Sequence, residues 1–336
     1  MMFRGLGISL SNEDPVDVTV ALSREADVLG YDEVSIPESR LFHSVTTVAA
    51  AVLAATENIT VRIGIASPVF RHPVALALEA ATLDEMAPGR VRFGVGAAEW
   101  TMRALGTTPA GWRPYTNTVE AVRAMRALTA GNALGFEPET FAASPEIRLD
   151  RPRSAGVPID IGAVSKRMME AVGRYADGVQ LGAITSVGYT KWSLQRVAAG
   201  ADLAGRTIAD LVVSGNVLTS VDADRAVARE AVREVLAYYL SRVEGVVVDE
   251  SGADPGHVEA VRDAVRSGGV EAGAEAVTEH LIDVFAVAGT VDEVIAGLSE
   301  FVDAGLSLPL VWHTLGPDPA EALRTIATLV RPALAG

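Results

Sequence analysis

The chain has 336 residues, of which 49% are hydrophobic, and it carries a formal net charge of −15. Because 43 acidic residues face only 28 basic ones, neither nucleic acid nor an anionic membrane is expected as a partner. The absence of cysteine excludes disulfides, thiolate nucleophiles and cysteine-bound metals, and it fits a reducing cytoplasm. With no apolar run of about 18 residues and no leader-like start, we expect a soluble, unexported protein.

The predicted elements follow one another in the pattern of repeated βα units. Short β-rich runs are predicted to be strands at residues 3–10, 33–37, 61–65, 91–96, 158–162, 178–182, 211–218 and 308–312. Apolar residues at helical spacing predict helices at residues 16–29, 45–56, 73–86, 116–129 and 222–243. Eight strands without a dinucleotide fingerprint favour a closed (β/α)₈ TIM barrel over a doubly wound sheet.

Residues 1–336 are expected to form a single barrel domain. Two segments depart from the repeat and are interpreted as insertions. Residues 132–157 are expected to form a hairpin over the barrel mouth, and residues 244–289 are expected to be helical from Pro255 onward. The active site of a TIM barrel lies at the C-terminal ends of its strands. Functional residues are therefore expected in the loops that follow the strands.

Two of these loops are rich in small residues. The third predicted strand leaves through Gly64-Ile65-Ala66, although an ordinary loop in which glycine relieves crowding also accounts for this segment. The fourth ends in Gly94-Val95-Gly96-Ala97-Ala98-Glu99, which lacks the third glycine of a dinucleotide fingerprint. Small residues there let a planar ring or another backbone approach closely. The last three residues of this run are therefore candidates for a pocket.

A third loop, Gly162-Ala163-Val164-Ser165-Lys166-Arg167, leads from the fifth strand into a helix. Main-chain N–H groups at a helix start, with a hydroxyl and two cations, suit a phosphate or another anion. The alternative is that Ser165 only caps its helix while the two cations are solvated. The five histidines are scattered along the chain, so no metal site is expected.

Several segments, in their order along the chain, resemble the bacterial-luciferase-like family of flavin- and deazaflavin-dependent oxidoreductases. They are Gly30-Tyr31-Asp32, Arg71-His72-Pro73, Thr82-Leu83-Asp84-Glu85, Pro88-Gly89-Arg90, Gly94-Val95-Gly96, Ile161-Gly162-Ala163, Ala176-Asp177-Gly178 and Ala288-Gly289-Thr290. The branch that the chain resembles most is that of the F420-dependent methylene-tetrahydromethanopterin reductases. The fold of that family is an eight-stranded barrel, in agreement with the strand count.

The resemblance implies where a cofactor binds. Gly64-Ile65 corresponds to a bulge with a non-prolyl cis peptide that backs the cofactor ring, and Ala66 follows it. Ser9, Ala97 and Ala98 are implied beside the cofactor. The phosphate or tail of the cofactor is implied near residues 162–166, where the family often has Gly-Pro in place of Val164-Ser165.

Three residues are candidates for catalysis. Glu38-Ser39 stands where the family usually has aspartate followed by histidine, and a carboxyl there positions the substrate or moves a proton. His43 is the nearest histidine. Ser9 stands where the reductases usually have glutamate, so Glu99 or Glu13 is a candidate to supply the missing carboxyl. The alternative is that these loop side chains are merely solvated.

We therefore predict an F420-dependent oxidoreductase that transfers a hydride between the deazaflavin and an unidentified organic substrate. The substrate candidates are a secondary alcohol, an activated alkene or imine, and a folate-like pterin. The alternatives are an FMN-dependent luciferase-like monooxygenase and a flavin-binding protein without turnover. The family resemblance also implies a homodimer.

Overall fold

The computed structural model describes residues 2–38, 40–106, 112–153, 155–243, 245–316 and 318–335. Within these ranges, eight parallel strands close into a barrel, because β9 pairs with both β7 and β1. The barrel strands are β1 (Gly7–Ser9), β2 (Glu33–Ile36), β3 (Thr60–Ala66), β4 (Val91–Gly96), β5 (Ile159–Ala163), β6 (Gly178–Leu181), β7 (Val212–Val221) and β9 (Leu308–Leu315). The predicted (β/α)₈ barrel and its eight strands are confirmed.

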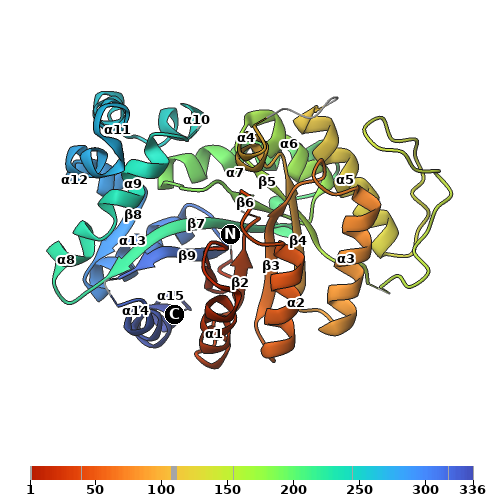
Figure 1. The fold of residues 1–336 in the computed structure, drawn as a ribbon, viewed down its shortest axis with the longest axis horizontal. Coiled ribbons are helices and arrows are strands. Elements are labelled where there is room, and N and C mark those ends of the chain that lie inside the picture. The colour runs from red at the N-terminus through yellow and green to blue at the C-terminus, as the bar shows by residue number, and fades with distance from the viewer. Residues whose placement is uncertain are drawn as a thin grey trace.

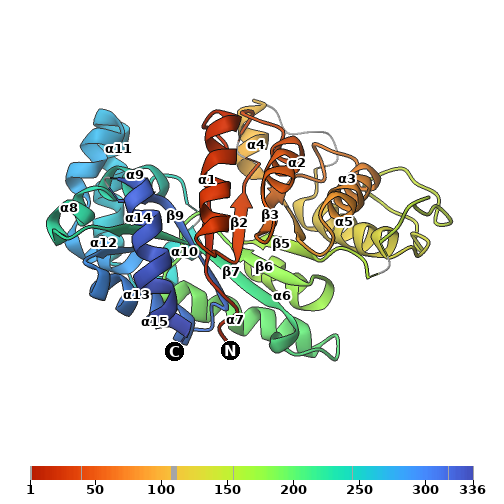
Figure 2. The same cartoon turned by 90° about the horizontal axis from the view of Figure 1, so that it is seen from below.

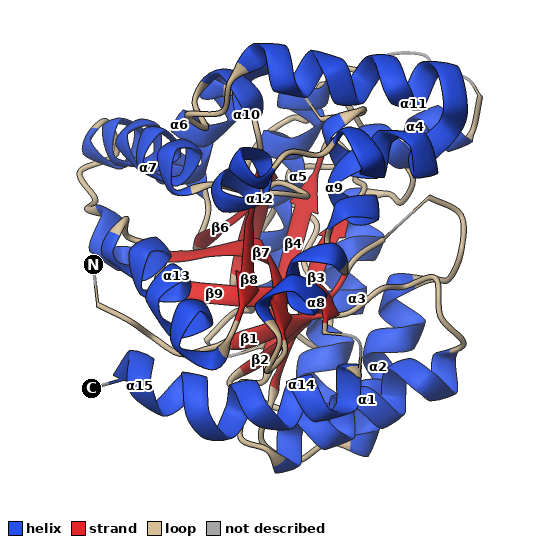
Figure 3. Cartoon of the chain, turned by 90° about the vertical axis from the view of Figure 1, so that its left-hand side faces the viewer, coloured by secondary structure: helices blue, strands red, loops and turns tan. Residues whose placement is uncertain are grey.

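Helices surround the strands on the outside (Figures 1 and 3). In chain order they are α1 (Val16–Val28), α2 (Val45–Ala55), α3 (Pro73–Met86), α4 (Glu99–Ala104), α5 (Pro114–Thr129), α6 (Lys166–Tyr175), α7 (Val187–Asp202), η1 (Ile208–Asp210), α8 (Arg225–Glu230), α9 (Arg233–Leu240), α10 (Gly245–Asp249), α11 (Pro255–Ala276), α12 (Glu279–Phe285), α13 (Val291–Asp303), α14 (Pro319–Thr325), η2 (Ile326–Val330) and α15 (Arg331–Ala335). None of the helices in the described ranges is long and apolar enough to cross a membrane.

The strands alternate between an apolar outer face and a polar or glycine-rich inner face. In β3, Val61 and Ile63 are fully buried among the apolar residues of the core. The alternate positions, Arg62 and Gly64, face the inside of the barrel. There Arg62 donates hydrogen bonds to carboxylates on β2 and β5. The two-residue period of a strand explains the alternation. The barrel interior is therefore unusually polar for a fold that is normally filled with branched apolar side chains.

A buried ion-pair network fills the lower part of the barrel. Arg62 is completely buried and donates hydrogen bonds to Glu33 of β2 and Asp160 of β5. Arg92 of β4 donates from Nε to Asp160 Oδ2 at 3.0 Å and from Nη2 to Oδ1 at 2.6 Å. Burial favours the neutral acid, yet Arg92 and Arg62 outweigh it and hold the pKa of Asp160 below its usual value. The two positive and two negative charges sum to zero, and their ion pairs link the four strands β2, β3, β4 and β5.

Glycine makes room for this network. At Gly178 of β6, an added Cβ would lie 2.6 Å from Asp160 Oδ1 and 2.9 Å from Arg92 Nη2. Both distances are shorter than van der Waals contact. Any side chain at this position would therefore displace the ion pair between Arg92 and Asp160.

The segment 244–289 differs from the expected insertion because it ends in a ninth strand, β8 (Ala286–Gly289). This strand pairs with the last four residues of β7, Leu218–Val221, beyond the point where β6 ends. No turn residue separates Phe285, the end of α12, from Ala286. A continuous apolar run of this kind hides a helix-to-strand change. The expectation of helix from Pro255 is otherwise confirmed by α11 and α12.

The predicted helix 222–243 is divided into α8 and α9. Arg229 of α8 and Arg233 of α9 both bind Glu279 of α12. Two guanidinium groups from successive helices thus converge on one carboxylate. Helices α8 to α12 gather on one side of the barrel (Figures 1 and 2).

The expectation of a hairpin over the barrel mouth at residues 132–157 is wrong. The described residues of this segment contain no strand, and two main-chain hydrogen bonds, Leu134 N to Ile147 O and Gly135 N to Pro145 O, join its arms. It lies along the outer side of α3 and α5 (Figure 1). The main-chain N–H of Glu139 donates to the buried carboxylate of Glu120 on α5 at 2.9 Å. This anchor holds the loop against the helices.

We predict that Asp160→Asn destabilises the protein by about 3–5 kcal/mol, because it leaves the buried Arg62 and Arg92 with an uncompensated charge. The free energy of unfolding at pH 7, measured by urea denaturation, tests this. The matched control is Asp263→Asn, which removes a carboxylate from an exposed pair with Arg266 and should cost no more than about 1 kcal/mol. Equal losses in the two variants would contradict the importance assigned to the buried network.

Candidate active site

A cavity of about 480 Å³ opens at the C-terminal ends of the barrel strands. Its floor is formed by Gly64 and Ile65 of β3, Gly162 of β5 and the side chains of Gln180 and Asn216 from β6 and β7. One wall comes from the loops after β4, β5 and β6, and the opposite wall from the loop after β1, the α9–α10 segment and β9. Of the fourteen residues predicted for the site, His43, Ala66 and Lys166 lie outside the lining.

The floor is shaped by a bulge in β3. The peptide bond between Gly64 and Ile65 is cis, and the register between β3 and β4 shifts between Ile63 and Ala66. The expected bulge and cis bond are confirmed. Ala66, directly after the bulge, is fully buried beneath the lining.

Three glycines surround the side chain of Ile65. An added Cβ would lie 2.8 Å from Ile65 Cγ2 at Gly94, 3.0 Å from Cδ1 at Gly96 and 2.9 Å from Cγ2 at Gly162. The Gly94-Val95-Gly96 run therefore makes room for a neighbouring side chain within the protein. A side chain, that of Ile65, approaches these glycines, whereas a planar ring or another backbone was expected there.

Polar atoms face the cavity from the floor. Gln180 is buried, and its Oε1 has no hydrogen-bond partner among the described residues. Its Nε2 lies 3.4 Å from Ser35 Oγ and 3.5 Å from Asn216 Oδ1. A Cβ on Gly64 would collide with Gln180 Oε1. A buried acceptor without a partner suits a ligand that donates a hydrogen bond.

Sequence reasoning missed Gln180 and Asn216. Gln180 falls within the predicted sixth strand, and only the barrel register shows that its side chain points inward. Ser9, which was predicted, is buried and lines the same cavity from β1.

Glu38 lies at the end of β2, and only 4% of its side chain is exposed. It forms an ion pair with Arg71, and its Oε2 accepts a hydrogen bond from Ser67 N at 3.0 Å. Arg71 also lies 3.8 Å from Glu79 Oε1. The pKa of Glu79 is raised above its usual value, because burial and nearby Glu38 raise it by more than Arg71 lowers it. Glu38 is thus a held anion that faces the cavity, and the neighbouring Ser39 lies outside the described residues.

The other two predicted catalytic residues occupy different positions. His43 Nδ1 lies 2.9 Å from Asn12 O, and Asn12 Nδ2 donates to His43 O at 3.1 Å. His43 therefore positions the loop after β1, which lines the cavity. Glu99 begins α4, directly after Ala98 in the left-handed conformation, and lines the mouth beside Arg103 at 3.3 Å.

The turn from β5 into α6 forms part of the cavity wall. Ser165 caps α6 by accepting a hydrogen bond from Met168 N at 3.4 Å. The buried Tyr189 of α7 donates to Val164 O at 3.0 Å and so holds the turn. Arg167 lines the cavity, and its guanidinium lies 3.8 Å from the centre of the Tyr115 ring. Lys166 lies outside the lining, and both residues are exposed.

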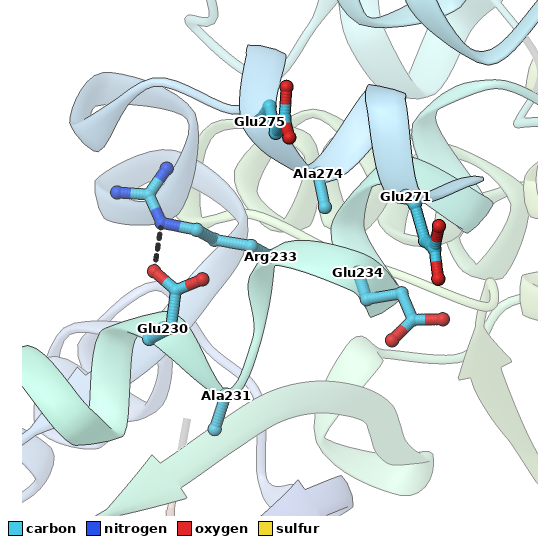
Figure 4. A pocket seen from close by; sticks show the side chains of 7 residues that line it. All are labelled: Glu230, Ala231, Arg233, Glu234, Glu271, Ala274 and Glu275. Atoms are coloured by element: carbon cyan, nitrogen blue, oxygen red, sulfur yellow. Dashed lines mark ion pairs between the residues drawn. The ribbon is translucent and has the colours of Figure 1, made fainter. Parts of the chain in front are cut away.

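A second cavity, of about 670 Å³, lies between α9 and α11, away from the strand ends (Figure 4). It is lined by Glu230, Ala231, Arg233, Glu234, Glu271, Ala274 and Glu275, and Arg233 pairs with Glu230 at 3.0 Å. Four carboxylates around one paired cation repel an anionic cofactor. Throughout the described ranges, no three His, Asp or Glu side chains form a group suited to a metal ion.

The sequence profile of the luciferase-like monooxygenase family matches residues 1–308. The chain belongs to this family. The 5,10-methylenetetrahydromethanopterin reductase of Methanolobus tindarius is 27% identical over 324 residues, which cover 95% of this chain and 97% of that protein. The F420-dependent glucose-6-phosphate dehydrogenase of Beutenbergia cavernae is 31% identical over 292 residues, which cover 84% of this chain and 81% of that protein.

Solved structures of luciferase-like proteins share the barrel. The coenzyme F420 dependent tetrahydromethanopterin reductase of Methanopyrus kandleri has a TM-score of 0.90 at 24% identity, with 98% of this chain and 99% of that chain covered. An F420-dependent secondary alcohol dehydrogenase, solved with an F420-acetone adduct, has a TM-score of 0.79 at 21% identity, with 99% of both chains covered. The family resemblance inferred from the motifs is confirmed.

We predict that Ile65→Ala lowers the free energy of unfolding by about 2 kcal/mol, because it leaves a void between Gly94, Gly96 and Gly162. It should also weaken ligand binding in the cavity, since Ile65 forms part of the floor. Urea denaturation and a ligand titration measure the two effects. Ile65→Val, which keeps most of the packing, should lose at most about 1 kcal/mol. An unchanged stability in Ile65→Ala would show that the bulge does not depend on this side chain.

Proposed function

We propose that this protein is an F420-dependent oxidoreductase that transfers a hydride between the deazaflavin and an organic substrate. The observation that carries the proposal is the Gly64–Ile65 bulge on the floor of a cavity with two distinct walls. Relatives from Beutenbergia cavernae and Rhodococcus erythropolis, 31% and 29% identical, are F420-dependent glucose-6-phosphate dehydrogenases. The shared family supports the same cofactor here.

The residues of the cavity fit this cofactor. Gly64 and Ile65, which are partly buried and line the cavity, offer a surface for a ring system, and Gln180 Oε1 offers an acceptor for a polar ring edge. The turn at residues 162–165 and the guanidinium of Arg167 suit an anionic tail. Bound F420 supplies the hydride donor or acceptor, and the protein supplies placement and electrostatics.

We assign three roles to the predicted catalytic residues. Glu38 is held by Arg71 and Ser67 N, so it acts as a fixed acceptor that orients the substrate. Glu99 stands at the mouth, where an exposed carboxylate exchanges protons with water. His43 is a positioning residue, because it fixes the loop after β1 through Asn12. Lys166 stays a predicted contact of the cofactor tail from outside the lining.

FMN-dependent monooxygenation is the second candidate function. The profile that matches the chain is that of luciferase-like monooxygenases, and the oxygenating constituent of 3,6-diketocamphane monooxygenase, solved with FMN, has a TM-score of 0.72. The same bulge and anion-binding turn would accept FMN. A flavin-binding protein without turnover is the third hypothesis. Ser9 stands where the reductases usually have glutamate, and Glu38-Ser39 stands where the family usually has aspartate followed by histidine.

The proposal extends to assembly and location. We infer that residues 1–336 act as one barrel domain, supported by one continuous apolar core. We further infer a homodimer, on the family resemblance, and a cytoplasmic location, on the absence of cysteine from the sequence.

A side-by-side titration with F420 and FMN tests the cofactor. We expect F420 to bind at least ten-fold more tightly, which corresponds to about 1.4 kcal/mol. We also expect substrate-dependent bleaching of its absorbance without oxygen uptake. Tight FMN binding with substrate-dependent oxygen uptake would instead establish the monooxygenase. Binding of F420 without reaction across a broad substrate panel would establish a non-catalytic protein.

Two neighbouring cations at the start of α6, Arg167 and Lys166, are compared to test which of them binds the cofactor tail. Arg167→Ala should weaken F420 binding about ten-fold and reduce its salt dependence, because a charge-assisted hydrogen bond contributes about 1.5–3 kcal/mol. Lys166→Ala is the matched control and should have a smaller effect, since Lys166 lies outside the cavity lining. The dissociation constants are measured at low and high salt. A larger loss in Lys166→Ala than in Arg167→Ala would reverse the assignment.

A further inference from the structure

The wall opposite the α6 turn is apolar and aromatic. It is built from Tyr238, Tyr239, Val243, Val246, Val247 and Trp312. The rings of Tyr239 and Trp312 meet edge to face with centroids 4.8 Å apart, and those of Tyr238 and Tyr239 with centroids 5.0 Å apart. We call this set of six residues the aromatic wall. A continuous apolar wall of this kind gains free energy by removing apolar ligand surface from water.

The charges beside the aromatic wall are already paired. Arg40, the cation that lines this half of the cavity, pairs with Glu13 at 3.0 Å, and its guanidinium lies 4.6 Å from the ring of Phe42. Glu38 pairs with Arg71. Burial, together with Tyr238 and Glu13, raises the pKa of Tyr239, so its phenol stays neutral at physiological pH. Among the described residues of this half of the lining, an anionic ligand would therefore meet no unpaired cation to offset the loss of its hydration.

The cationic group on the opposite wall is Arg167, which the proposed function assigns to the cofactor tail. The net charge of −15 adds a long-range electrostatic repulsion of anions. The cavity of about 480 Å³ must also hold the cofactor ring, so the remaining space suits a compact molecule.

We propose that the aromatic wall binds an uncharged, largely apolar substrate, and that sugar phosphates are not substrates of this protein. The inference rests on the proposed function and names its substrate class. For an alcohol of this class, the C–H bond of the alcohol carbon would break and the hydride, with its electron pair, would pass to F420 held in the cavity. The hydroxyl proton would leave to water at the mouth, and a C=O bond would form. In the reverse reaction, the carbonyl carbon would take up a hydride from reduced F420 and the carbonyl oxygen would take up a proton from water.

Matched ligands test the charge preference. Cyclohexanol and cyclohexyl phosphate share a ring and differ in charge, and both are titrated calorimetrically into the protein with and without bound F420. We expect cyclohexanol to bind at least ten-fold more tightly, and cyclohexanol to be oxidised in preference to glucose 6-phosphate. Tighter binding of the phosphate, or no binding of cyclohexanol in either state, overturns the inference.

Substitutions at Val246 test the location. Val246 is half-buried on the aromatic wall, and Val227 of α8, outside the cavity, is 41% exposed. Val246→Asp should weaken cyclohexanol binding at least ten-fold and leave F420 binding unchanged, whereas Val227→Asp should change neither. Val246→Arg should instead strengthen binding of cyclohexyl phosphate, because it supplies an unpaired cation. Thermal melting checks that each variant is folded.

The outcomes separate this inference from the proposed function. Failure of the wild-type protein to bind F420 contradicts the proposed function, while the titrations without cofactor still measure the charge preference. Binding of F420 with a preference for the phosphate contradicts the substrate class alone. An unchanged cyclohexanol affinity in Val246→Asp contradicts the assignment of the aromatic wall.

Discussion

The structure depends on one buried charge network. Arg62 is among the largest fully buried side chains in the described ranges, and it lies inside the barrel between Glu33 and Asp160, with Arg92 as the fourth member. Removing ions from water is costly, so the network is tolerated only because every charge has a partner in good geometry. The four residues come from β2, β3, β4 and β5, so their pairing requires these strands to stand in register around a closed barrel.

The layer above the network is small or polar, and this leaves the barrel hollow at its mouth. The inward positions after Arg62, Arg92 and Asp160 are Gly64, Gly94 and Gly162. Ile65 fills the space between Gly94, Gly96 and Gly162 and shapes the floor of the cavity. A side chain at Gly94 or Gly162 would displace Ile65, and one at Gly64 would collide with Gln180 and Ser35. The same small residues therefore preserve both the bulge and the space above it.

The two walls of the cavity have different chemistry and different origins. The loops after β4 and β5 belong to the regular repeat and provide a helix start and Arg167, which suit an anionic group. The α9–α10 segment departs from the repeat and provides most of the aromatic wall. Under the proposed function, this division would place cofactor binding on the common part of the barrel and substrate choice on the part in which the chain departs from it, in keeping with the variability of loops on a rigid scaffold.

The amino-acid sequence by itself determined the eight barrel strands, the bulge at Gly64-Ile65 through the family motifs, and most of the cavity lining after β4 and β5, because strand period and glycine placement are local signals. Only the tertiary structure decided that β8 follows α12 without a turn, that the 132–157 loop lies outside α3 and α5, and that Gln180 and Trp312 face one cavity. Tertiary structure likewise paired Glu38 with Arg71 and placed Arg167, not Lys166, in the lining. These features depend on inward direction and on contacts between distant segments, which barrel closure alone sets.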